Sequence, residues 1–406
     1  MTVLKNIAKL RRYNTQYGLR NTVRRIMGQL LNRSEASSTS FLGKDDIIAS
    51  YAQYLGYPHG DAVNLANAEN SSFQWVIPNF SSGSGGHLNI FRFIRMLETR
   101  GFKQHIVIVG HHNWSSREAA KKAIEKWYFP VNATLGFGYQ DFQPSEFTIA
   151  TGWQTAYWVH HYKATKDKYY FVQDFEPYFH PVSTEYVIAE NTYRLGLKGI
   201  TAGNWLSKKL TTHYGMECFD LSFSFDKYHY LPTPKRENPN FNILFYSRHV
   251  TPRRLFGIGL LALEKLCEKY DDIAVIFAGG DVSGFKIPFH HLNAGELSLD
   301  ELPDLYSQCD LSLVLSGTNL SLLPLELAAC KCPTVMNNSP SARWLLPDNA
   351  AFYADMEPSA LRRVLEKAYL NEKLRNETAM RAYNFAQTTS WEAQVDKLLQ
   401  YMGINS

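Results

Sequence analysis

Cysteine is scarce in this sequence, and long apolar runs are missing from it. The five cysteines are odd in number and scattered, without the paired spacing of a zinc site or a disulfide framework. No apolar core of a signal peptide stands near the start, and no uninterrupted apolar run is long enough to span a bilayer. We therefore expect a reduced, cytoplasmic protein that is neither secreted through a signal peptide nor integral to a membrane.

Acidic residues are also missing from the first 34 positions, which carry eight lysines and arginines before Glu35. Apolar residues recur there at roughly helical spacing, so residues 1–40 predict a basic helical extension. Residues 1–34 fit two interpretations equally. One is a helix on an anionic membrane surface, where each basic side chain contributes on the order of 1 kcal/mol, and the other is a solvated helix packed on its own domain. No nucleic-acid-binding motif follows, so we expect no nucleic-acid partner.

The rest of the chain has the length and composition of two folded domains. The sequence has 406 residues, of which 45% are hydrophobic, enough for two packed cores. Short apolar runs alternate with helix-like stretches up to residue 210, and a proline-rich polar stretch at residues 230–240 interrupts the pattern before a second series begins. This α/β pattern predicts two doubly wound, Rossmann-like domains, residues 41–230 and 241–390.

The most informative stretch is residues 311–336. An apolar strand precedes a polar loop and a helix-like run at residues 322–330, and a second strand follows, so the stretch predicts a βαβ unit. The first turn of such a helix offers free backbone N–H groups and the positive end of its dipole to a phosphate. Glu326, about one turn inside, is placed to hold a sugar hydroxyl. This combination suits a nucleotide sugar.

Basic residues follow the first strand of the second series, in residues 246–254. Arg248, Arg253 and Arg254 can neutralise a diphosphate, since arginine grips two phosphate oxygens at once. An exposed basic turn is the alternative interpretation. We favour the phosphate site because Glu326 stands in the same predicted domain.

Two features of the first series are also typical of a ligand site. The glycine-rich turn at residues 81–87 lets the backbone approach a ligand closely, although it lacks the lysine of a phosphate-binding loop. Asp174 and Glu176 follow a strand, where either carboxylate can take a proton from an acceptor hydroxyl or place an acceptor sugar. A strand end with one solvated acid is the equal alternative. Their spacing is also that of a metal motif, but we predict no metal because the arginines supply the countercharge.

Residues 322–335 resemble the donor-binding signature of family 4 glycosyltransferases, which have the two-domain GT-B fold with a cleft between the domains. The family signature has two Glu residues separated by seven others. Glu326 matches the second of them, whereas Thr318 stands at the first. The resemblance implies that Glu326 holds the ribose and that Thr318 marks a changed contact with the donor sugar.

The same resemblance assigns further residues to that cleft. Arg248 and then Arg253, or Arg254 after a slip of one position, stabilise the diphosphate as it leaves. The first domain binds the acceptor, and residues 391–406 cross back to it as a terminal helix. The remaining donor-side candidates are backbone or loop positions, namely Gly85 and Gly86 beside His87, Glu296 and Leu297 at the nucleobase, and Gly317, Asn319, Leu320 and Ser321 at the sugar and phosphates.

Three segments, residues 150–156, 172–177 and 190–196 with its continuation at 200–206, resemble the WsaF-type rhamnosyltransferases of bacterial cell-surface glycan assembly. The resemblance implies a metal-independent hexosyltransferase without a cofactor. It would transfer L-rhamnose from dTDP-L-rhamnose to a rhamnan chain on a lipid carrier, as in S-layer glycan synthesis, at the inner face of the cell membrane. The acceptor-side candidates, each of which could equally be a packing residue, are Trp153, Thr155, Tyr193 and Arg194.

Several questions stay open at this stage. Thr318 carries no charge, so either recognition of a deoxy sugar is altered while the anomeric configuration is retained, or the enzyme inverts with Asp174 or Glu176 as base. Nucleobase contacts made by the backbone do not separate thymine from uracil. Two other hypotheses keep the fold: a catalytically inactive scaffold that binds glycan or nucleotide at a membrane, and an enzyme that isomerises a nucleotide sugar.

Overall fold

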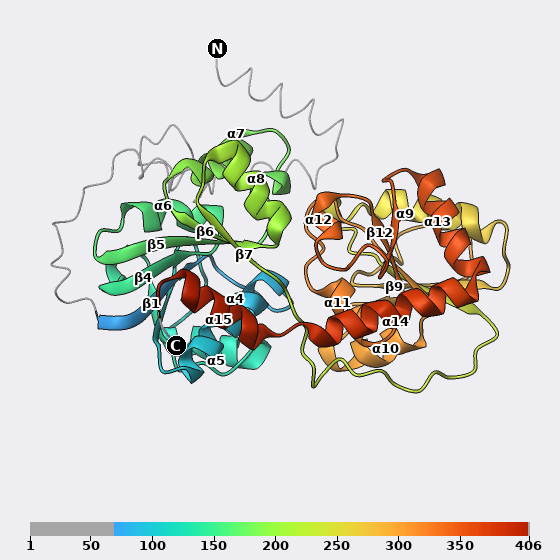
Figure 1. The fold of residues 1–406 in the computed structure, drawn as a ribbon, viewed down its shortest axis with the longest axis horizontal. Coiled ribbons are helices and arrows are strands. Elements are labelled where there is room, and N and C mark those ends of the chain that lie inside the picture. The colour runs from blue at the N-terminus through green and yellow to red at the C-terminus, as the bar shows by residue number, and fades with distance from the viewer. Residues whose placement is uncertain (1–68, 405–406) are drawn as a thin grey trace, which may run out of the picture. The chain divides into compact units, whose positions relative to one another are not determined.

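The computed structural model describes residues 69–404, which belong to one compact unit. The predicted helical extension, residues 1–40, lies outside the described residues, as does its membrane contact. Within residues 69–404, two parallel β-sheets are each surrounded by helices (Figure 1). The predicted α/β class with two doubly wound sheets is therefore confirmed. No helix of this part of the chain combines the length and the apolar character that crossing a membrane requires.

The first half of the described chain, residues 69–221, builds a seven-stranded sheet. Its elements are β1 (Glu69–Ile77), α4 (Gly85–Thr99), β2 (Lys103–Ile108), α5 (Arg117–Trp127), β3 (Thr134–Phe137), η2 (Tyr139–Asp141), β4 (Ser145–Ala150), α6 (Trp153–His161), β5 (Thr165–Val172), η3 (Glu176–Phe179), α7 (Thr184–Asn191), η4 (Thr192–Arg194), β6 (Lys198–Ala202), α8 (Asn204–Tyr214) and β7 (Cys218–Leu221). The strand order is β3-β2-β1-β4-β5-β6-β7, with all neighbours parallel. The order reverses between β1 and β4, and ligands bind such sheets at the carboxyl ends of the strands at this point.

The second half, residues 241–401, builds a six-stranded sheet and ends in two long helices. Its elements are β8 (Phe241–Tyr246), η5 (Pro252–Arg254), α9 (Phe256–Cys267), β9 (Ile273–Ala278), β10 (His291–Gly295), η6 (Leu299–Glu301), α10 (Leu302–Gln308), β11 (Leu311–Val314), α11 (Leu323–Ala329), β12 (Thr334–Asn337), α12 (Pro340–Arg343), β13 (Phe352–Ala354), α13 (Pro358–Leu370), α14 (Glu372–Thr388) and α15 (Trp391–Tyr401). The order β10-β9-β8-β11-β12-β13, again all parallel, reverses between β8 and β11.

Apolar side chains cover both faces of the first sheet. Trp75 and Ile77 of β1 belong to the core that contains apolar residues of α4, α5 and α15. Val76 points to the opposite face and packs with α6 and α8. Figure 1 shows these two groups of helices on opposite sides of the strands. A parallel sheet buried on both faces needs apolar residues at successive positions, which is why these strands read as continuous apolar runs.

The second sheet is covered in the same way. Ile243 and Phe245 of β8 pack with apolar residues of α9 and α13, whereas Leu244 faces the core that holds α10, α11 and α14. Gly259 of α9 permits a close approach of this helix to the sheet, because a Cβ there would lie 2.3 Å from the ring of Phe245. The sheet and its helices therefore form a layered core that fixes the loops at the strand ends.

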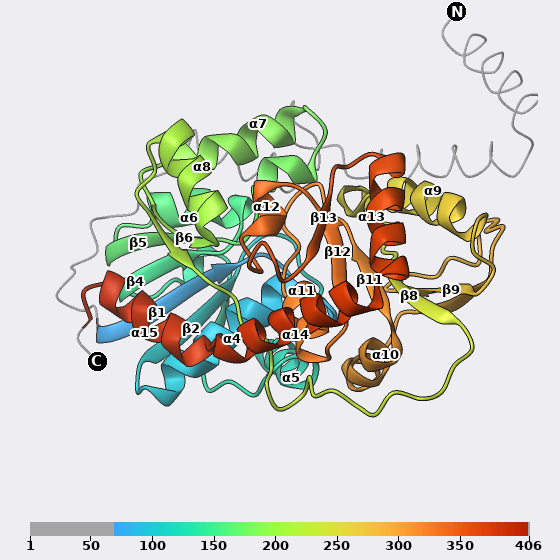
Figure 2. The same ribbon diagram turned by 45° about the vertical axis from the view of Figure 1, so that its right-hand side comes forward.

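The C-terminal helix returns to the first half. Helix α15 contacts α4 and β7, and Asp396 forms an ion pair of 2.6 Å with Arg100. The side-chain oxygen of Gln394 accepts the N–H of Ser222 at 2.9 Å. Figure 2 shows α14 and α15 following one another from the second sheet to the first. The two halves are thus tied together by the end of the chain as well as by residues 222–240.

Candidate functional site

One cavity of about 300 Å³ lies where the carboxyl ends of the two sheets meet. Loops that follow β1, β4 and β5 line it from the first half, and loops that follow β8 and β11 line it from the second half. Both points of strand-order reversal are therefore beside the same cavity. Ligands bind doubly wound sheets at such points, so this cavity is the candidate site.

Two arginines of η5 provide positive charge to the cavity. Arg253 and Arg254 both line it, and no carboxylate of the described residues forms an ion pair with either of them. The guanidinium of Arg253 lies 4.3 Å from the ring centre of Phe179, and Arg254 donates a hydrogen bond of 3.0 Å to the carbonyl oxygen of Asn319. Burial, and then the neighbouring charge of Arg254, lowers the pKa of Arg253. Two adjacent, half-buried guanidiniums that are not ion-paired with an acid are a site for an anion with more than one charge.

The loops that carry these arginines are held in a strained conformation. Leu255 and Ser321, which are not glycine, adopt φ angles of 54° and 61° in the left-handed region. The N–H of Gly317 donates a hydrogen bond of 2.7 Å to the carbonyl oxygen of Arg253 and so fastens the loop after β11 to the loop after β8. Strained backbone persists only where its surroundings hold it, and such places cluster at ligand sites.

Asp174 connects the two halves at the cavity. Its carboxylate accepts the N–H of Asn319, with its two oxygens at 3.2 and 3.3 Å, and a hydrogen bond from the hydroxyl of Thr318. The side-chain amide of Asn319 in turn donates to the carbonyl oxygen of Gln173 at 2.8 Å. Burial raises the pKa of Asp174, and the Thr318 hydrogen bond and the charge of Arg253 oppose this rise. The loop after β11 is therefore fixed to the loop after β5.

Glu176 also lines the cavity but is bonded to its own half. The side chain is 5% exposed, and its Oε2 accepts the N–H of Trp153, the first residue of α6, at 2.6 Å. Its backbone N–H donates to the hydroxyl of Tyr193 at 3.0 Å. Burial raises the pKa of Glu176 to about 8. At neutral pH this residue is a carboxylic acid that can donate a hydrogen bond.

The glycine-rich turn faces the loop after β11. A Cβ on Gly85 would lie 3.5 Å from the hydroxyl of Ser321, and the carbonyl oxygen of Gly86 accepts a 2.9 Å hydrogen bond from Gln173. His87 lines the cavity, and its Nδ1 lies 2.8 Å from the hydroxyl of Ser84. Burial lowers the pKa of His87 to about 4, so the imidazole is neutral. The structure thus brings these candidates together with Asn319 and Ser321.

Several predicted donor residues do not line this cavity, among them Arg248, Glu296, Leu297 and Glu326. Arg248 and Glu296 are exposed, and Leu297 packs against the core after β10. Glu326 lies in the first turn of α11 and shares a hydrogen bond with Tyr230, a residue of the connection between the sheets. Burial raises the pKa of Glu326 to about 7.

The remaining candidates have identifiable surroundings. Leu320 is buried in the core, and the hydroxyl of Thr155 bonds the backbone of residues 151 and 152 before α6. Trp153 lines the cavity, whereas Tyr193 is buried beneath it. Arg194 is exposed and lies 4.7 Å from a tyrosine ring. Of the acceptor candidates, Trp153 is therefore the one that the structure places at the site.

Sequence analysis did not single out several residues of the cavity wall, and two of them, Gln173 and Phe179, contact other parts of that wall. Gln173 bonds both the glycine turn and the loop after β11, but one amide before an acidic residue is no recognisable signal. Phe179, which stacks on Arg253, stands in an apolar stretch with Tyr178 and Val182, all of them exposed. Exposed apolar residues directly after a strand were the signal that could have identified it.

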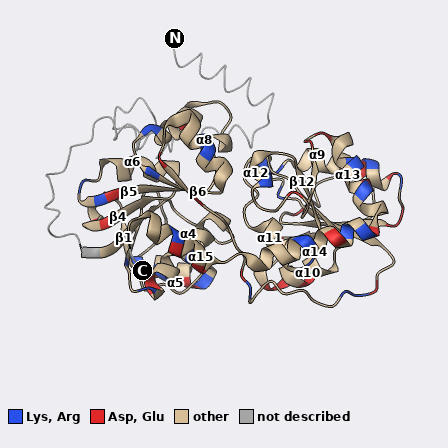
Figure 3. Cartoon of the chain, viewed as in Figure 1, with Lys and Arg blue, Asp and Glu red and all other residues tan. Residues whose placement is uncertain are grey.

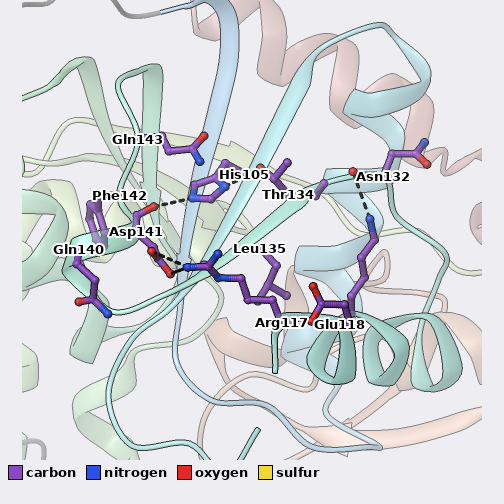
Figure 4. A pocket seen from close by; sticks show the side chains of 13 residues that line it. His105, Arg117, Glu118, Asn132, Thr134, Leu135, Gln140, Asp141, Phe142 and Gln143 are labelled. Atoms are coloured by element: carbon purple, nitrogen blue, oxygen red, sulfur yellow. Dashed lines mark hydrogen bonds and ion pairs between the residues drawn. The ribbon is translucent and has the colours of Figure 1, made fainter. Parts of the chain in front are cut away.

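A larger cavity lies elsewhere on the first half, beside β2, β3 and α5 (Figure 4). It has a volume of about 510 Å³, but several of its polar groups are already bonded within the protein. Arg117 forms two hydrogen bonds, of 2.9 and 2.8 Å, with the carboxylate of Asp141. His105 contacts the Thr134 hydroxyl and the Asp141 carbonyl oxygen at 2.7 and 2.8 Å. With these groups already paired, the smaller cavity between the sheets is the better candidate site.

Charge elsewhere does not compete with the arginine pair. Lysines and arginines are interspersed with acids over both halves of the described chain (Figure 3). Among residues 69–404, no group of three or more histidine, cysteine, aspartate or glutamate side chains is arranged to hold a metal ion. The feature that distinguishes the cavity is therefore its two adjacent guanidiniums, neither of which forms an ion pair.

Solved structures with the same arrangement of two sheets define the class. Sucrose-phosphate synthase from Thermosynechococcus elongatus has a TM-score of 0.61 with this chain at 10% identity, covering 82% of this chain and 98% of its own. Anabaena HepE in complex with UDP-glucose also has a TM-score of 0.61, at 15% identity, and covers the same shares. The chain has the GT-B fold of glycosyltransferases.

Two family models narrow the class. The WsaF C-terminal domain matches residues 241–366, and the WsaF N-terminal domain matches residues 137–204. The O-antigen biosynthesis protein RfbC of Myxococcus xanthus is 30% identical over 343 residues, which make up 80% of this chain and 26% of that protein. This chain thus spans about a quarter of that relative's length. The chain is a WsaF-like member of the GT-B glycosyltransferases, and this confirms the predicted family.

Proposed function

We propose that this protein transfers L-rhamnose from dTDP-L-rhamnose to a lipid-linked, rhamnan-type glycan acceptor during the assembly of a surface glycan. The observation that carries the proposal is the pair of unpaired guanidiniums, Arg253 and Arg254, in a cavity at the reversal points of both sheets. The sugar is inferred from the resemblance of three segments to WsaF-type rhamnosyltransferases, and the likeness to an O-antigen biosynthesis protein supports the kind of product.

The second half binds the donor in this proposal. The diphosphate lies against Arg253 and Arg254, whose charge opposes the negative charge that develops on the phosphate oxygens as the glycosidic bond breaks. Arg254 is held in place by its hydrogen bond to Asn319, and Arg253 by its stacking on Phe179. Preorganised donors of this kind need no rearrangement during the reaction. The proposal requires neither a metal ion nor a cofactor.

The first half binds the acceptor. Trp153 and Glu176 line the cavity from this side, where the protonated acid offers a hydrogen-bond donor to a sugar. Transfer by inversion needs a base, and Asp174 and Glu176 are the candidates. Transfer with retention needs none, so the anomeric outcome separates the two mechanisms. Proton NMR of the fresh linkage is the measurement.

The lipid carrier of the acceptor places the reaction at a membrane surface. We propose that the protein works in the cytoplasm at the inner face of the cell membrane, with residues 1–34 as its contact to anionic lipid. Deleting these residues should weaken sedimentation with anionic liposomes while nucleotide binding stays unchanged. Equal sedimentation of both forms would contradict the membrane contact.

Calorimetric titration with dTDP, UDP and GDP tests the donor side. The wild type should prefer dTDP, and Arg253→Ala should lower the affinity by on the order of a hundredfold, since charged hydrogen bonds to a buried phosphate are lost. Arg117→Ala is the matched control because it removes an arginine from the other cavity. Preference for UDP or GDP would contradict dTDP-L-rhamnose as the donor but would still agree with a glycosyltransferase that uses a nucleotide sugar.

A catalytically inactive scaffold is the second candidate. It is favoured by Thr318, which stands where family 4 enzymes carry a glutamate, and by the engagement of Asp174 in a bond between the halves. A scaffold would bind nucleotide or glycan without turnover. Transfer of rhamnose to a synthetic lipid-linked rhamnose acceptor, lost in Arg253→Ala, would exclude it.

A further inference from the structure

The carboxylate of Asp174 lies within the donor half although its residue belongs to the acceptor half. It follows β5 of the first sheet, yet its side chain is bonded to Thr318 and Asn319 of the loop after β11. Asp174 and Asn319 are 145 positions apart in the sequence. The residue is 8% exposed, and what remains accessible faces the cavity that it lines. A negative charge from one half thus sits among the loop donors of the other.

A sugar attached to a diphosphate at Arg253 and Arg254 needs hydrogen-bond acceptors. Guanidiniums and backbone N–H groups only donate, so they serve the phosphates but not the protons of sugar hydroxyls. Two carboxyl groups of the described residues line the cavity, Asp174 and Glu176. Glu176 is committed to the N–H of Trp153 and is protonated at neutral pH. Asp174 is therefore the better acceptor for a sugar hydroxyl beside the arginines.

The geometry of Asp174 leaves room for that contact. A carboxylate has about four acceptor positions on its two oxygens, and three donors use them here: the N–H of Phe175 at 2.8 Å, the N–H of Asn319, which is shared between both oxygens, and the hydroxyl of Thr318. Burial raises the pKa of Asp174, and the charges of Arg253 and Arg254 oppose this rise. A hydroxyl that enters the cavity can therefore find an unused lone pair.

We propose that Asp174 binds a hydroxyl of the donor sugar, so that the half that holds the acceptor supplies the carboxylate that Thr318 does not. This inference rests on the proposed function. It makes the sugar part of the donor depend on both halves, whereas the nucleotide diphosphate depends on the second half alone. Nucleotide-sugar recognition is thereby coupled to the contact between the Asp174 and Asn319 loops.

Titration with two ligands separates the sugar from the nucleotide. The probes are dTDP and dTDP-L-rhamnose, and the measured quantity is the ratio of their affinities in one protein. The wild type should prefer dTDP-L-rhamnose. Asp174→Asn should lower that preference by on the order of tenfold, the size expected for a charged hydrogen bond, and leave dTDP affinity nearly unchanged. An equal loss for both ligands would overturn the proposal, because Asp174 would then act only on the architecture of the site.

A second variant moves the charge instead of removing it. Thr318 and Asp174 are hydrogen-bond partners, so Thr318→Glu in the Asp174→Asn background returns a carboxylate from the opposite side of the same bond. Recovery of the preference for dTDP-L-rhamnose would support the proposal. A ratio in this double variant equal to that of Asp174→Asn, with dTDP binding intact, would overturn it.

Failure of the proposed function looks different from failure of this inference. A wild type that binds neither dTDP nor dTDP-L-rhamnose would overturn the donor assignment and the role of Asp174 with it. A wild type that binds both, with a ratio that Asp174→Asn does not change, would overturn the role of Asp174 and leave the donor assignment standing. Circular dichroism of each variant confirms that the fold is retained in every comparison.

Discussion

The two walls of the cavity treat charge in opposite ways. On the wall of the first half, Asp174 and Glu176 are buried acids whose oxygens accept hydrogen bonds from the protein. On the wall of the second half, Arg253 and Arg254 are half-buried cations that form no ion pair with an acid of the described residues, although the charge of Asp174 acts on both of them. Partly buried charges without an ion pair destabilise the folded state, so we expect their counterion to be a bound ligand. The difference therefore assigns the anionic part of the ligand to the second half and its neutral, hydroxyl-rich part to the first.

Reversing one charge on the arginine wall should have the largest effect. Glu at position 253 would pair with Arg254 and repel a diphosphate, so Arg253→Glu should lower dTDP affinity by on the order of a thousandfold. Isothermal calorimetry at low salt measures the loss. The affinity of the wild type should also fall with rising salt, because part of it is electrostatic.

The matched control reverses a charge at the other cavity. Arg117→Glu breaks the ion pair with Asp141 but leaves the two walls unchanged, so dTDP affinity should stay within a factor of about two. If Arg253→Glu and Arg117→Glu weakened dTDP binding equally, the contrast between the walls would have no functional meaning.

Glu176→Gln should change how stability depends on pH. The pKa of Glu176 is about 8 in the folded protein, against an ordinary value of 4.5. Between these values the folded state holds a proton that the unfolded chain has released, so the free energy of unfolding falls as pH rises. Glutamine keeps the acceptor for Trp153 and does not titrate. The variant should therefore gain stability relative to the wild type, by on the order of a few kcal/mol near pH 9.

Urea denaturation at pH 5 and pH 9 measures this difference. Glu185→Gln is the control, since Glu185 is only partly buried and hydrogen bonds lower its pKa instead of raising it. The same gain at alkaline pH in both variants would show that burial of Glu176 is not its cause. Transfer activity of Glu176→Gln at each pH also tests whether the ionised form is the base of an inverting reaction.

Weakening the packing between the two halves should reduce the binding of the donor sugar more than the binding of dTDP. A Cβ on Gly203, before α8, would lie 2.4 Å from the ring of Trp344, which also packs 5.2 Å from the ring centre of Phe223. Trp344→Ala removes this packing and should cost about 2 kcal/mol in the free energy of unfolding. Because Asp174 comes from the first half, the preference for dTDP-L-rhamnose over dTDP should shrink while dTDP affinity stays.

The matched variant keeps an aromatic ring. The indole nitrogen of Trp344 has no hydrogen-bond partner, so Trp344→Phe loses volume but no bond and should retain most of the preference. A preference that is unchanged in Trp344→Ala would show that sugar recognition does not need this contact. Thermal unfolding followed by fluorescence checks the stability of both forms.

The elements were more predictable from sequence than the site. The apolar strand predicted at the start of residues 311–336 is β11 in the structure, because a parallel strand buried on both faces is a largely apolar run. The contact between Asp174 and Asn319 could not be predicted, since no local pattern specifies a partner 145 positions away. Asp174 was expected to face the acceptor, whereas its hydrogen bonds reach the donor loop.

For Glu326, the sequence predicted the position of the residue but not its hydrogen-bond partner. Its position in the first turn of a helix was predicted from sequence, and α11 places it there. Its partner Tyr230 belongs to a stretch that sequence analysis read only as a connection. A motif fixes where a side chain starts, but tertiary packing decides which group it meets.

Arg248→Ala should have the smallest effect of these changes. The motif puts Arg248 in the first position of the phosphate site, yet its side chain is exposed and does not line the cavity, whereas Arg253 and Arg254 do. Water and salt screen the attraction between an exposed guanidinium and a phosphate, so this attraction adds little to binding. The dTDP affinity should therefore fall by about threefold or less. Calorimetry measures the dTDP affinity of Arg248→Ala and of Arg253→Ala under the same conditions. A loss as large as that of Arg253→Ala would mean that the ligand draws the loop after β8 inward, and the arginine wall would then have three members.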